Sequence, residues 1–462
     1  MTKLTDFTKT IVALATALGS GSIAVVRLSG RRAIEIAGEN FSDKDIINAA
    51  PNTIHHGRMA DNHGVIDDVL VSVFRSPQSY TGEDVVEISC HANAIIVDRL
   101  IDQLIRSGAS HAGPGEFTLR AFLNGKIDLS QAEAVSDIIA SRSSSGLSRA
   151  LDQLQGGLSR KIHLIKEKVV DIISLLEIDL DFSEENIEIA SAESIQSQLQ
   201  EIRQNVISMV NTYNYARLFD GSLKIALIGP TNAGKSTLLN AFLGEDRAIT
   251  SKTPGTTRDV IYENVLIDDT WIRLVDTAGL RDTRDVLEKE GIRRTHNQIL
   301  ESDLIIYVVD VSKKLSGHDR KNIESIVDGI GERVIFAANK IDKNKNIQSY
   351  HFLNNFSCPV VAVSAKRLDG IADLKRQIVV TLTGGHEISK DEFVIISLRH
   401  KEILEQTAET IDHAYMALEN NMGFECVTID LRETLDHIGK ITGETVTEDI
   451  LNNIFSEFCI GK

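Results

Sequence analysis

The stretch "GPTNAGKS", residues 229–236, matches the pattern G-x-x-x-x-G-K-[ST] and lies between the apolar run "KIALI" and the helical segment "TLLNAFLG". Between a strand and a helix, glycines let backbone N–H groups wrap around phosphates at the helix N-terminus. Lys235 then reaches the β- and γ-phosphate oxygens, and Ser236 is a ligand for Mg²⁺. A purely structural glycine turn is the alternative. The order of strand, loop and helix favours a nucleotide-binding loop.

Three further stretches follow in the order that a GTP-binding domain requires. "DTAG" (276–279) comes after the apolar run "IRLV", which places Asp276 near the magnesium ion and the final glycine near the γ-phosphate. "NKID" (339–342) also follows a strand-like run, and Asp342 can accept hydrogen bonds from guanine N1 and N2. Adenine lacks those two donors. With "SAK" (364–366) completing the base pocket, the set favours GTP over ATP.

Between these stretches lies the polar segment "TSKTPGTTRD" (250–259), which is suited to a loop that orders around the γ-phosphate. Thr257 is available there as a second magnesium ligand; an ordinary exposed loop is the alternative. The expected contacts to GTP are Asn232, Ala233, Gly234, Lys235, Ser236, Thr237, Ser251, Lys252, Thr253, Pro254, Gly255, Thr256, Thr257, Asp276, Thr277, Ala278, Gly279, Asn339, Lys340, Asp342, Ser364, Ala365 and Lys366.

One position departs from Ras-like enzymes, which place a water-orienting glutamine directly after "DTAG". Here that position is Leu280, whose side chain cannot orient water. Hydrolysis therefore needs another group, and the segment "RDTRDVLEKEGI" offers several. The acidic candidates, among which the residues themselves do not decide, are Asp282, Asp285, Glu288 and Glu290.

The composition is that of a soluble multidomain protein. The 462 residues are 42% hydrophobic and 25% charged, enough to build roughly two to four domains with buried cores. The four cysteines are scattered without C-x-x-C spacing, which indicates reduced thiols in a cytoplasmic protein. A formal net charge of −17 argues against non-specific coating of nucleic acid but allows a local basic patch.

The hydrophobic pattern changes along the chain. Short strand-like runs with one helix come first, followed by a helical stretch in which Ile162, Ile165, Val169, Ile172 and Leu176 recur at spacings of three and four. Near-continuous apolar runs then alternate with helical segments, as in a buried parallel sheet. Helical periodicity returns at the end.

These changes predict a multidomain chain of α/β and all-α class. We expect an N-terminal α/β domain (1–122), a helical domain split in sequence (123–220 and 384–462), and an inserted Ras-like P-loop GTPase domain with a mostly parallel sheet (221–383).

No membrane attachment is expected. The terminal "CIGK" (459–462) fits a C-a-a-X lipidation signal poorly, because its second aliphatic position is Gly461 and its last residue is Lys462. No apolar run approaches the roughly 20 residues that a membrane span requires. A cleaved leader is disfavoured because Asp6 interrupts the basic start and the second apolar run "IAVVRL" follows, as in a pair of strands.

Over its full length the sequence resembles the MnmE family, also called TrmE, of tRNA-modifying GTPases. The resemblance is carried by "TIVALAT", "IAVVRLSG", "YTGEDVVEISCHA", "GPGEFTLRAFLNGKIDLSQAEAV", "GTTRD" and the terminal "FCIGK". It implies a homodimer that acts with the FAD-containing partner MnmG, as a heterotetramer. Together they would install an aminomethyl-type or carboxymethylaminomethyl group at C5 of the wobble uridine of certain tRNAs, with 5-formyl- or methylene-tetrahydrofolate supplying the one-carbon unit.

The resemblance also implies roles in GTP hydrolysis. Hydrolysis would be activated by K⁺ and by pairing of two GTPase domains, with K⁺ taking the charge-neutralising role of an arginine. The matching K⁺ ligands are Asn232, Ser251, Thr253 and Thr256. Glu288 matches the residue that positions water.

In the first domain, the family's folate-binding positions match Arg27, Glu87 and Lys126, with Lys462 near the bound folate. A cation can pair with the glutamate carboxylate of folate, and a carboxylate can accept from pterin N–H groups. Without the family, each is more often a surface charge. The family folds its terminus towards this pocket, which makes Cys459 a candidate for the modification chemistry. The alternative is a cysteine that only packs behind Phe458.

Two other functions remain open from the sequence. One is a GTPase switch that binds ribosomal RNA during ribosome assembly, since such proteins share "GTTRD" and the phosphate loop. The other is a nucleotide-regulated scaffold without chemistry of its own. The terminal "CIGK" and the split helical domain favour the tRNA-modifying enzyme.

Overall fold

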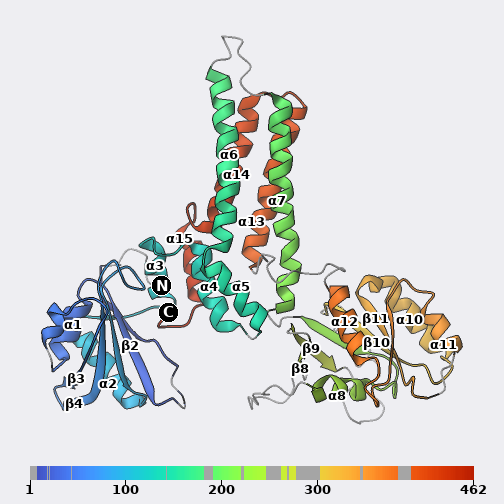
Figure 1. The fold of residues 1–462 in the computed structure, drawn as a ribbon, viewed down its shortest axis with the longest axis horizontal. Helices are drawn as coiled ribbons and strands as arrows, with labels where there is room; N and C mark the ends of the chain where they lie inside the picture. Colours follow the sequence, from blue (N-terminus) through green and yellow to red (C-terminus); the bar gives the residue numbers. More distant parts are fainter. Residues whose placement is uncertain are drawn as a thin grey trace. The chain divides into compact units, whose positions relative to one another are not determined.

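The structure is a computed structural model that describes residues 8–17, 19, 21–42, 44–141, 143–181, 191–219, 223–245, 262–267, 270–276, 302–343, 347–382 and 397–462 (Figure 1). The chain forms two compact units. The first comprises Met1–Ile139, Leu151–Arg203 and Ile403–Lys462, and the second comprises Ala140–Ala150 and Gln204–Glu402.

The first unit begins with a six-stranded sheet in the order β3-β4-β5-β2-β1-β6. Every neighbouring pair is antiparallel except β1 and β6, which are parallel. The predicted pairing of the first two apolar runs is present, since β1 lies against β2. The elements of this part are β1 (Ile11–Leu14), β2 (Ile23–Ser29), α1 (Ala33–Asn40), a 3₁₀ helix (Lys44–Asn48), β3 (Thr53–Asp61), β4 (Gly64–Phe74), β5 (Val85–His91), α2 (Ala94–Arg106) and β6 (Ser110–His111).

The two faces of this sheet have different roles. Alternate residues of a strand point to opposite faces, so Val26 and Leu28 of β2 enter the core beneath α1 and α2. Arg27, between them, faces the other side. On β5, Val86 and Ile88 belong to the same core. The second face carries a small apolar cluster of Ile11, Ala13, Ala112 and Phe117, and Arg27 lies on this face opposite Ala13 of β1.

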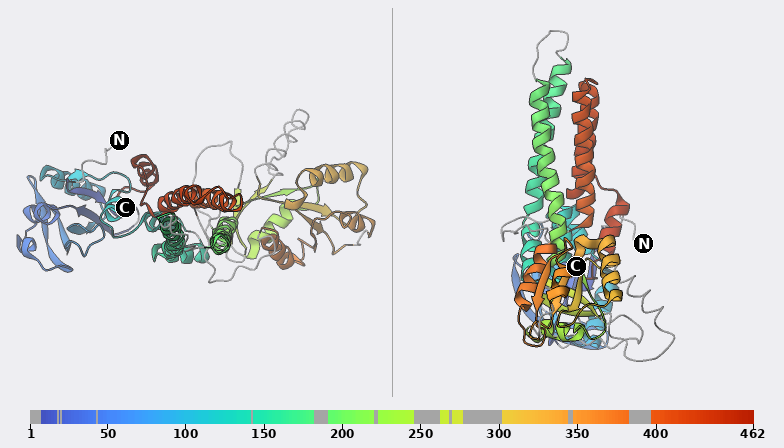
Figure 2. Two further views of the ribbon diagram at one scale, coloured as in Figure 1. Left: turned by 90° about the horizontal axis from the view of Figure 1, so that it is seen from above. Right: turned by 90° about the vertical axis from the view of Figure 1, so that its right-hand side faces the viewer.

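The helical part of the first unit joins two distant stretches of sequence. The helices of these stretches are α3 (Glu116–Leu123), α4 (Leu129–Ala140), α5 (Ser144–Leu154), α6 (Gly157–Asp181), α7 (Ala192–Phe219), α13 (Leu398–Glu419), α14 (Phe424–Thr442) and α15 (Glu448–Ser456). Of these, α5, α7 and α13 each include residues of both units. Helix α6 packs along α14, as Figures 1 and 2 show. All five residues of the stripe predicted on α6 are buried. Glu177 on α6 accepts a hydrogen bond from Arg432 on α14 at 2.6 Å.

The second unit contains a six-stranded sheet in the order β12-β11-β10-β7-β9-β8. All neighbouring strands are parallel except β8 and β9, which pair antiparallel. Its elements are β7 (Lys224–Ile228), α8 (Lys235–Glu245), β8 (Tyr262–Ile267), β9 (Thr270–Asp276), β10 (Leu304–Asp310), α10 (Gly317–Ile330), a 3₁₀ helix (Gly331–Arg333), β11 (Val334–Asn339), α11 (Ile347–Leu353), β12 (Val360–Val363) and α12 (Ile371–Leu382).

Helices cover both faces of this sheet. Phe242 of α8 and Leu374 of α12 share one core with the strands, and Ile323 of α10 and Leu353 of α11 share the core on the other face. Strands β10 and β11 are therefore apolar at nearly every position, because both faces are buried.

The predicted fold class is confirmed: an α/β domain, helices from two separated stretches, and an inserted domain with a mostly parallel sheet. The bounds of the four predicted segments remain predictions. Strand β8, the antiparallel edge, was not anticipated. Among the described residues, no helix has the length and apolarity to cross a bilayer.

Candidate functional site

The parallel strands of the second unit bring the predicted nucleotide-binding stretches to one edge of the sheet. The phosphate loop follows β7, Asp276 ends β9, Asn339 ends β11, and Ser364 comes directly after β12. Because these strands run in the same direction, their carboxyl ends lie side by side, which is where α/β sheets bind ligands. The topology therefore gathers stretches that lie far apart in sequence.

The phosphate loop has a backbone shape that depends on glycine. Gly229 has φ 141° and Gly234 has φ 101°, a region that side chains with a Cβ rarely adopt. A Cβ on Gly229 would lie 2.3 Å from the Val308 carbonyl oxygen, and one on Gly234 would lie 2.3 Å from Asn339 Nδ2. Asn232, at φ 64°, is the left-handed residue between them, a conformation that asparagine tolerates. The loop is thus pressed against β10 and β11.

Positive charge is concentrated where the loop enters α8. Lys235 is the first residue of this helix, and its ammonium group donates to the carbonyl oxygens of Gly229 at 2.7 Å and Pro230 at 3.0 Å. Ser236 and Thr237 follow in the first turn and are exposed. Unpaired N–H groups at a helix N-terminus attract anions. The lysine, the hydroxyls and the helix N-terminus therefore fit a nucleotide phosphate with its magnesium ion.

Asn339 connects the phosphate loop to the base-binding loops. Its side chain is only 2% exposed. Its Nδ2 donates to the Ala233 carbonyl at 2.8 Å, and its Oδ1 accepts from the backbone N–H groups of Lys340 at 2.8 Å and Ala365 at 3.1 Å. A buried amide that loses such partners costs about 1–3 kcal/mol. Asn339 therefore holds three of the predicted stretches in one arrangement.

The acceptor for guanine is positioned by a neighbouring hydroxyl. Ser364, fully buried, donates from Oγ to Asp342 Oδ1 at 2.8 Å. This hydrogen bond lowers the pKa of Asp342 below its ordinary value. The carboxyl group is therefore ionised at neutral pH and can accept from the N1 and N2 groups of guanine. Lys366 follows on the same loop and is exposed.

Lys340 makes a second connection, to a residue that the sequence analysis missed. Its ammonium group donates to the Asn232 carbonyl at 2.5 Å and to Asp310 Oδ2 at 2.7 Å. Burial raises the pKa of Asp310, but hydrogen bonds from Lys340 and Ser312 outweigh it, so the pKa is lowered overall. Asp310 could have been found, because it ends the apolar run "LIIYVVD" and so lies at the same sheet edge.

Several predicted contacts lie outside the described residues. They are the K⁺ and γ-phosphate loop Ser251, Lys252, Thr253, Pro254, Gly255, Thr256 and Thr257, the residues Thr277, Ala278 and Gly279, and the predicted water-positioning Glu288. Within the described part of the chain, no cluster of three His, Cys, Asp or Glu side chains suits a metal ion.

The first unit contains a second polar site, on the face of its sheet that carries Arg27. Arg27 of β2 lies directly opposite Glu87 of β5, and its Nε donates to Glu87 Oε1 at 2.8 Å. The guanidinium carbon of Arg27 is 5.4 Å from the centre of the Tyr80 ring and 5.7 Å from that of Phe117. Neither ring was among the predicted site residues, although Tyr80 opens the stretch "YTGEDVVEISCHA".

The C-terminal residues complete this second site. The Arg27 Nη1 donates to the Gly461 carbonyl at 3.4 Å, and the Phe117 backbone N–H donates to the Lys462 carbonyl at 3.2 Å. Gly461 has φ 96°, and a Cβ there would lie 2.1 Å from the Leu14 carbonyl oxygen. Cys459 is exposed. The terminus is therefore docked against the Arg27 side of the sheet.

Lys126 belongs to the same neighbourhood but is not in contact with Arg27 in the structure. Its ammonium group donates to the Pro77 carbonyl at 3.0 Å, on the loop that carries Tyr80. The cation of Arg27, the Glu87 carboxylate and two flat rings form a set that fits a ligand with carboxylate and aromatic parts, such as a folate. The Nε and Nη2 atoms of Arg27 both contact Glu87 Oε1, which leaves Oε2 for ligand donors.

The fold and the first site define the class of this protein: a P-loop GTP-binding domain inserted into a helical domain. The comparisons with known proteins identify the family. The family model described as MnmE helical domain matches residues 129–459, and that described as GTP-binding protein TrmE N-terminus matches residues 10–126.

Curated relatives agree over the full length. The tRNA modification GTPase MnmE of Cytophaga hutchinsonii is 38% identical over 461 residues, covering 100% of this chain and 99% of that protein. Its counterpart from Clostridioides difficile is 39% identical, covering 98% and 99%. That of Moorella thermoacetica is 42% identical, with the same coverage. The chain belongs to the MnmE family of tRNA modification GTPases, which confirms the resemblance and the prediction of a GTPase.

The phosphate loop yields a prediction about Gly234. Gly234→Ala places a Cβ against Asn339 and strains the positive φ, at a cost of about 1–3 kcal/mol. We expect GTP affinity, measured with a fluorescent GTP analogue, to fall roughly ten- to hundredfold. Gly329→Ala is the matched control, because nothing lies within 4 Å of its added methyl, and it should leave affinity unchanged. Equal affinity of the two variants would contradict this account of the loop.

Proposed function

We propose that this protein couples GTP hydrolysis to modification of C5 of the wobble uridine of certain tRNAs. In this proposal it acts in the cytoplasm as a homodimer with the FAD-containing partner MnmG, and it adds an aminomethyl or carboxymethylaminomethyl group whose one-carbon unit comes from 5-formyl- or methylene-tetrahydrofolate. The observation that carries the proposal is the presence, in one chain of the MnmE family, of a guanine-nucleotide site and a docked "CIGK" terminus at the Arg27–Glu87 pair.

In the nucleotide site, Lys235 and the first turn of α8 hold the phosphates, and Asp342 selects guanine. Ser236 and Thr257 hold the magnesium ion. When bound, that ion supplies positive charge for the β- and γ-phosphates. Asn339 holds the phosphate loop and the base-binding loop together, because its side chain bonds to Ala233 of the first and to Ala365 of the second.

K⁺ activation is supported by the fixed position of Asn232. Its left-handed backbone is held by the hydrogen bond from Lys340 to its carbonyl oxygen, so its side chain starts from a defined point beside the phosphates. Ser251, Thr253 and Thr256 are the further proposed ligands. A monovalent cation there neutralises charge that develops during hydrolysis. Glu288 is proposed to orient the attacking water, a task that Leu280 cannot perform.

In the folate site, Arg27 and Glu87 are the proposed contacts from the sheet, and Lys126 and Lys462 are proposed from its rim. Cys459 is the proposed reactive side chain. Its exposure and its position two residues before Gly461, which contacts Arg27, support this role. A buried cysteine such as Cys90 is not suited to it, because burial raises the pKa of that thiol to about 11.

Nucleoside mass spectrometry of tRNA tests the function as a whole. Deletion of the gene should abolish the modified wobble nucleoside, and the wild-type gene should restore it. If Cys459 acts chemically, Cys459→Ser should not restore it, whereas Cys426→Ser should. Unchanged nucleosides in the deletion strain would refute the tRNA function. Full restoration by Cys459→Ser would show that the terminus is only structural.

K⁺ dependence tests the proposed cation site. We expect wild-type GTP hydrolysis to be roughly tenfold or more faster in KCl than in NaCl at equal ionic strength, because the cation stabilises transition-state charge. Asn232→Ala should reduce the KCl rate to the NaCl rate. A wild-type protein that hydrolyses GTP equally in both salts would eliminate the K⁺ site.

Glu288 can be tested by separating hydrolysis from binding. Removal of the group that positions water should lower kcat by roughly a hundredfold or more, so Glu288→Ala should show this loss. The affinity for a fluorescent GTP analogue should stay within about twofold, since no binding energy is assigned to this side chain. Glu290→Ala, two residues away, serves as the control. If Glu288→Ala hydrolyses GTP at the wild-type rate, another acidic residue must orient the attacking water.

A further inference from the structure

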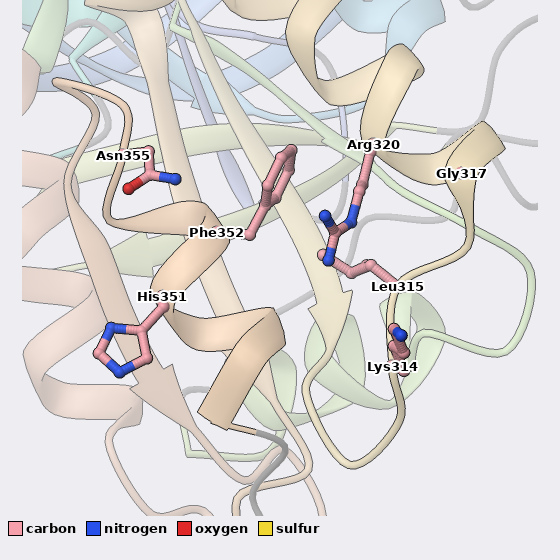
Figure 3. A pocket seen from close by; sticks show the side chains of 7 residues that line it. All are labelled: Lys314, Leu315, Gly317, Arg320, His351, Phe352 and Asn355. Atoms are coloured by element: carbon pink, nitrogen blue, oxygen red, sulfur yellow. The ribbon is translucent and has the colours of Figure 1, made fainter.

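A shallow surface hollow of about 650 Å³, called the α10–α11 cavity below, lies open to solvent in the second unit where the start of α10 meets α11 (Figure 3). Its lining includes Lys314, Arg320, His351, Phe352 and Asn355. None of these residues belongs to the predicted GTP contacts. Ligand pockets of about 300–1,000 Å³ hold small molecules or nucleotide-sized groups, so this volume is large enough for one nucleotide of a longer chain.

The cavity lies in a basic stretch of an acidic protein. The whole chain has 66 Asp and Glu residues against 49 Lys and Arg, yet residues 313–321 contain four Lys or Arg and one acid, Asp319. That carboxylate is used locally, since its Oδ2 accepts from Ser316 Oγ at 2.6 Å in the capping box of α10. Within the described residues, neither Lys314 nor Arg320 forms an ion pair. Their positive charge is therefore available to an anionic ligand.

An aromatic ring fixes one of these cations in place. The guanidinium carbon of Arg320 is 4.8 Å from the centre of the Phe352 ring, and Figure 3 shows the two side chains pointing towards each other from α10 and α11. Phe352 is held in turn by Phe356, whose ring centre is 5.3 Å away at an interplanar angle of 80°. A guanidinium plane supported in this way can stack on a base while donating to a phosphate.

We propose that this cavity is an RNA-binding surface, in which Lys314 and Arg320 contact phosphodiester groups and an unstacked base lies against the Arg320–Phe352 pair. The inference rests on the proposed function, because tRNA is then the RNA that meets this surface. Asn355, at the rim, offers amide donors and acceptors to the base edge. Exposed Lys313 and Lys321 extend the positive charge beyond the cavity, which suits a polynucleotide better than a free mononucleotide.

The test is tRNA binding by the full-length protein, measured by fluorescence anisotropy over a range of salt concentrations. The double variant Lys314→Ala/Arg320→Ala should bind tRNA roughly tenfold more weakly near 100 mM salt and lower the slope of log affinity against log salt by about two. The matched control Lys375→Ala/Arg376→Ala removes the same charge from α12 in the same unit. It should retain wild-type affinity and slope.

GTP-analogue binding should be equal in all three proteins, which shows that the domain is folded. Wild-type tRNA affinity in the double variant, or an equal loss in the control, overturns the inference while leaving the proposed function intact. Absence of tRNA binding by the wild-type protein overturns the inference, whereas the proposed function is decided separately by the nucleosides of the deletion strain. Binding of adenosine monophosphate that the double variant loses, without a change in tRNA affinity, would instead assign a mononucleotide pocket and also overturn it.

Discussion

The packing of α6 against α14 is the constraint on which the architecture of this chain depends. Each helix carries an apolar stripe that must be buried, and the two stripes bury each other although the GTP-binding domain separates them in sequence. The chain must therefore leave the helical part and return to it. Its return packs Phe455 and Phe458 against Leu119 of α3 and Leu129 of α4, and it brings Gly461 to Arg27 of the first sheet. Long-range helix packing thereby completes a site built on strands.

In the GTP-binding domain, the equivalent constraint is the satisfaction of buried polar groups. Asn339 and the Lys340–Asp310 pair have partners on the phosphate loop and on the base-binding side. Leaving the buried Asn339 amide unpaired would cost more than its hydrogen bonds contribute by themselves. The phosphate loop and the base loop are consequently held as one arrangement, so both ends of a bound nucleotide meet a preformed surface.

The terminus depends on a different constraint, the close approach of two backbones. Only glycine fits position 461, because a Cβ would overlap the Leu14 carbonyl and the backbone has a positive φ. This fit lets the Gly461 carbonyl reach Arg27 and leaves Cys459 exposed on the same short segment. Cys459 thus has a defined position two residues from the contact with Arg27, where its carbonyl oxygen accepts from the Gly115 N–H at 3.5 Å.

The sequence by itself determined the local secondary structure of this protein and its phosphate-binding motif. Strand runs buried on both faces, the apolar stripe of α6 and the phosphate loop between a strand and a helix are all encoded within about 25 neighbouring residues, where periodicity and glycine chemistry act. The tertiary structure alone decided that Arg27 faces Glu87, that Asp310 serves Lys340, and that Tyr80 and Phe117 flank the guanidinium group. Those pairings depend on strand register and on loops meeting at a sheet edge. Strand register, and the return of the C-terminal stretch to the helical part, are set by packing between residues far apart in sequence. No local sequence pattern contains that information.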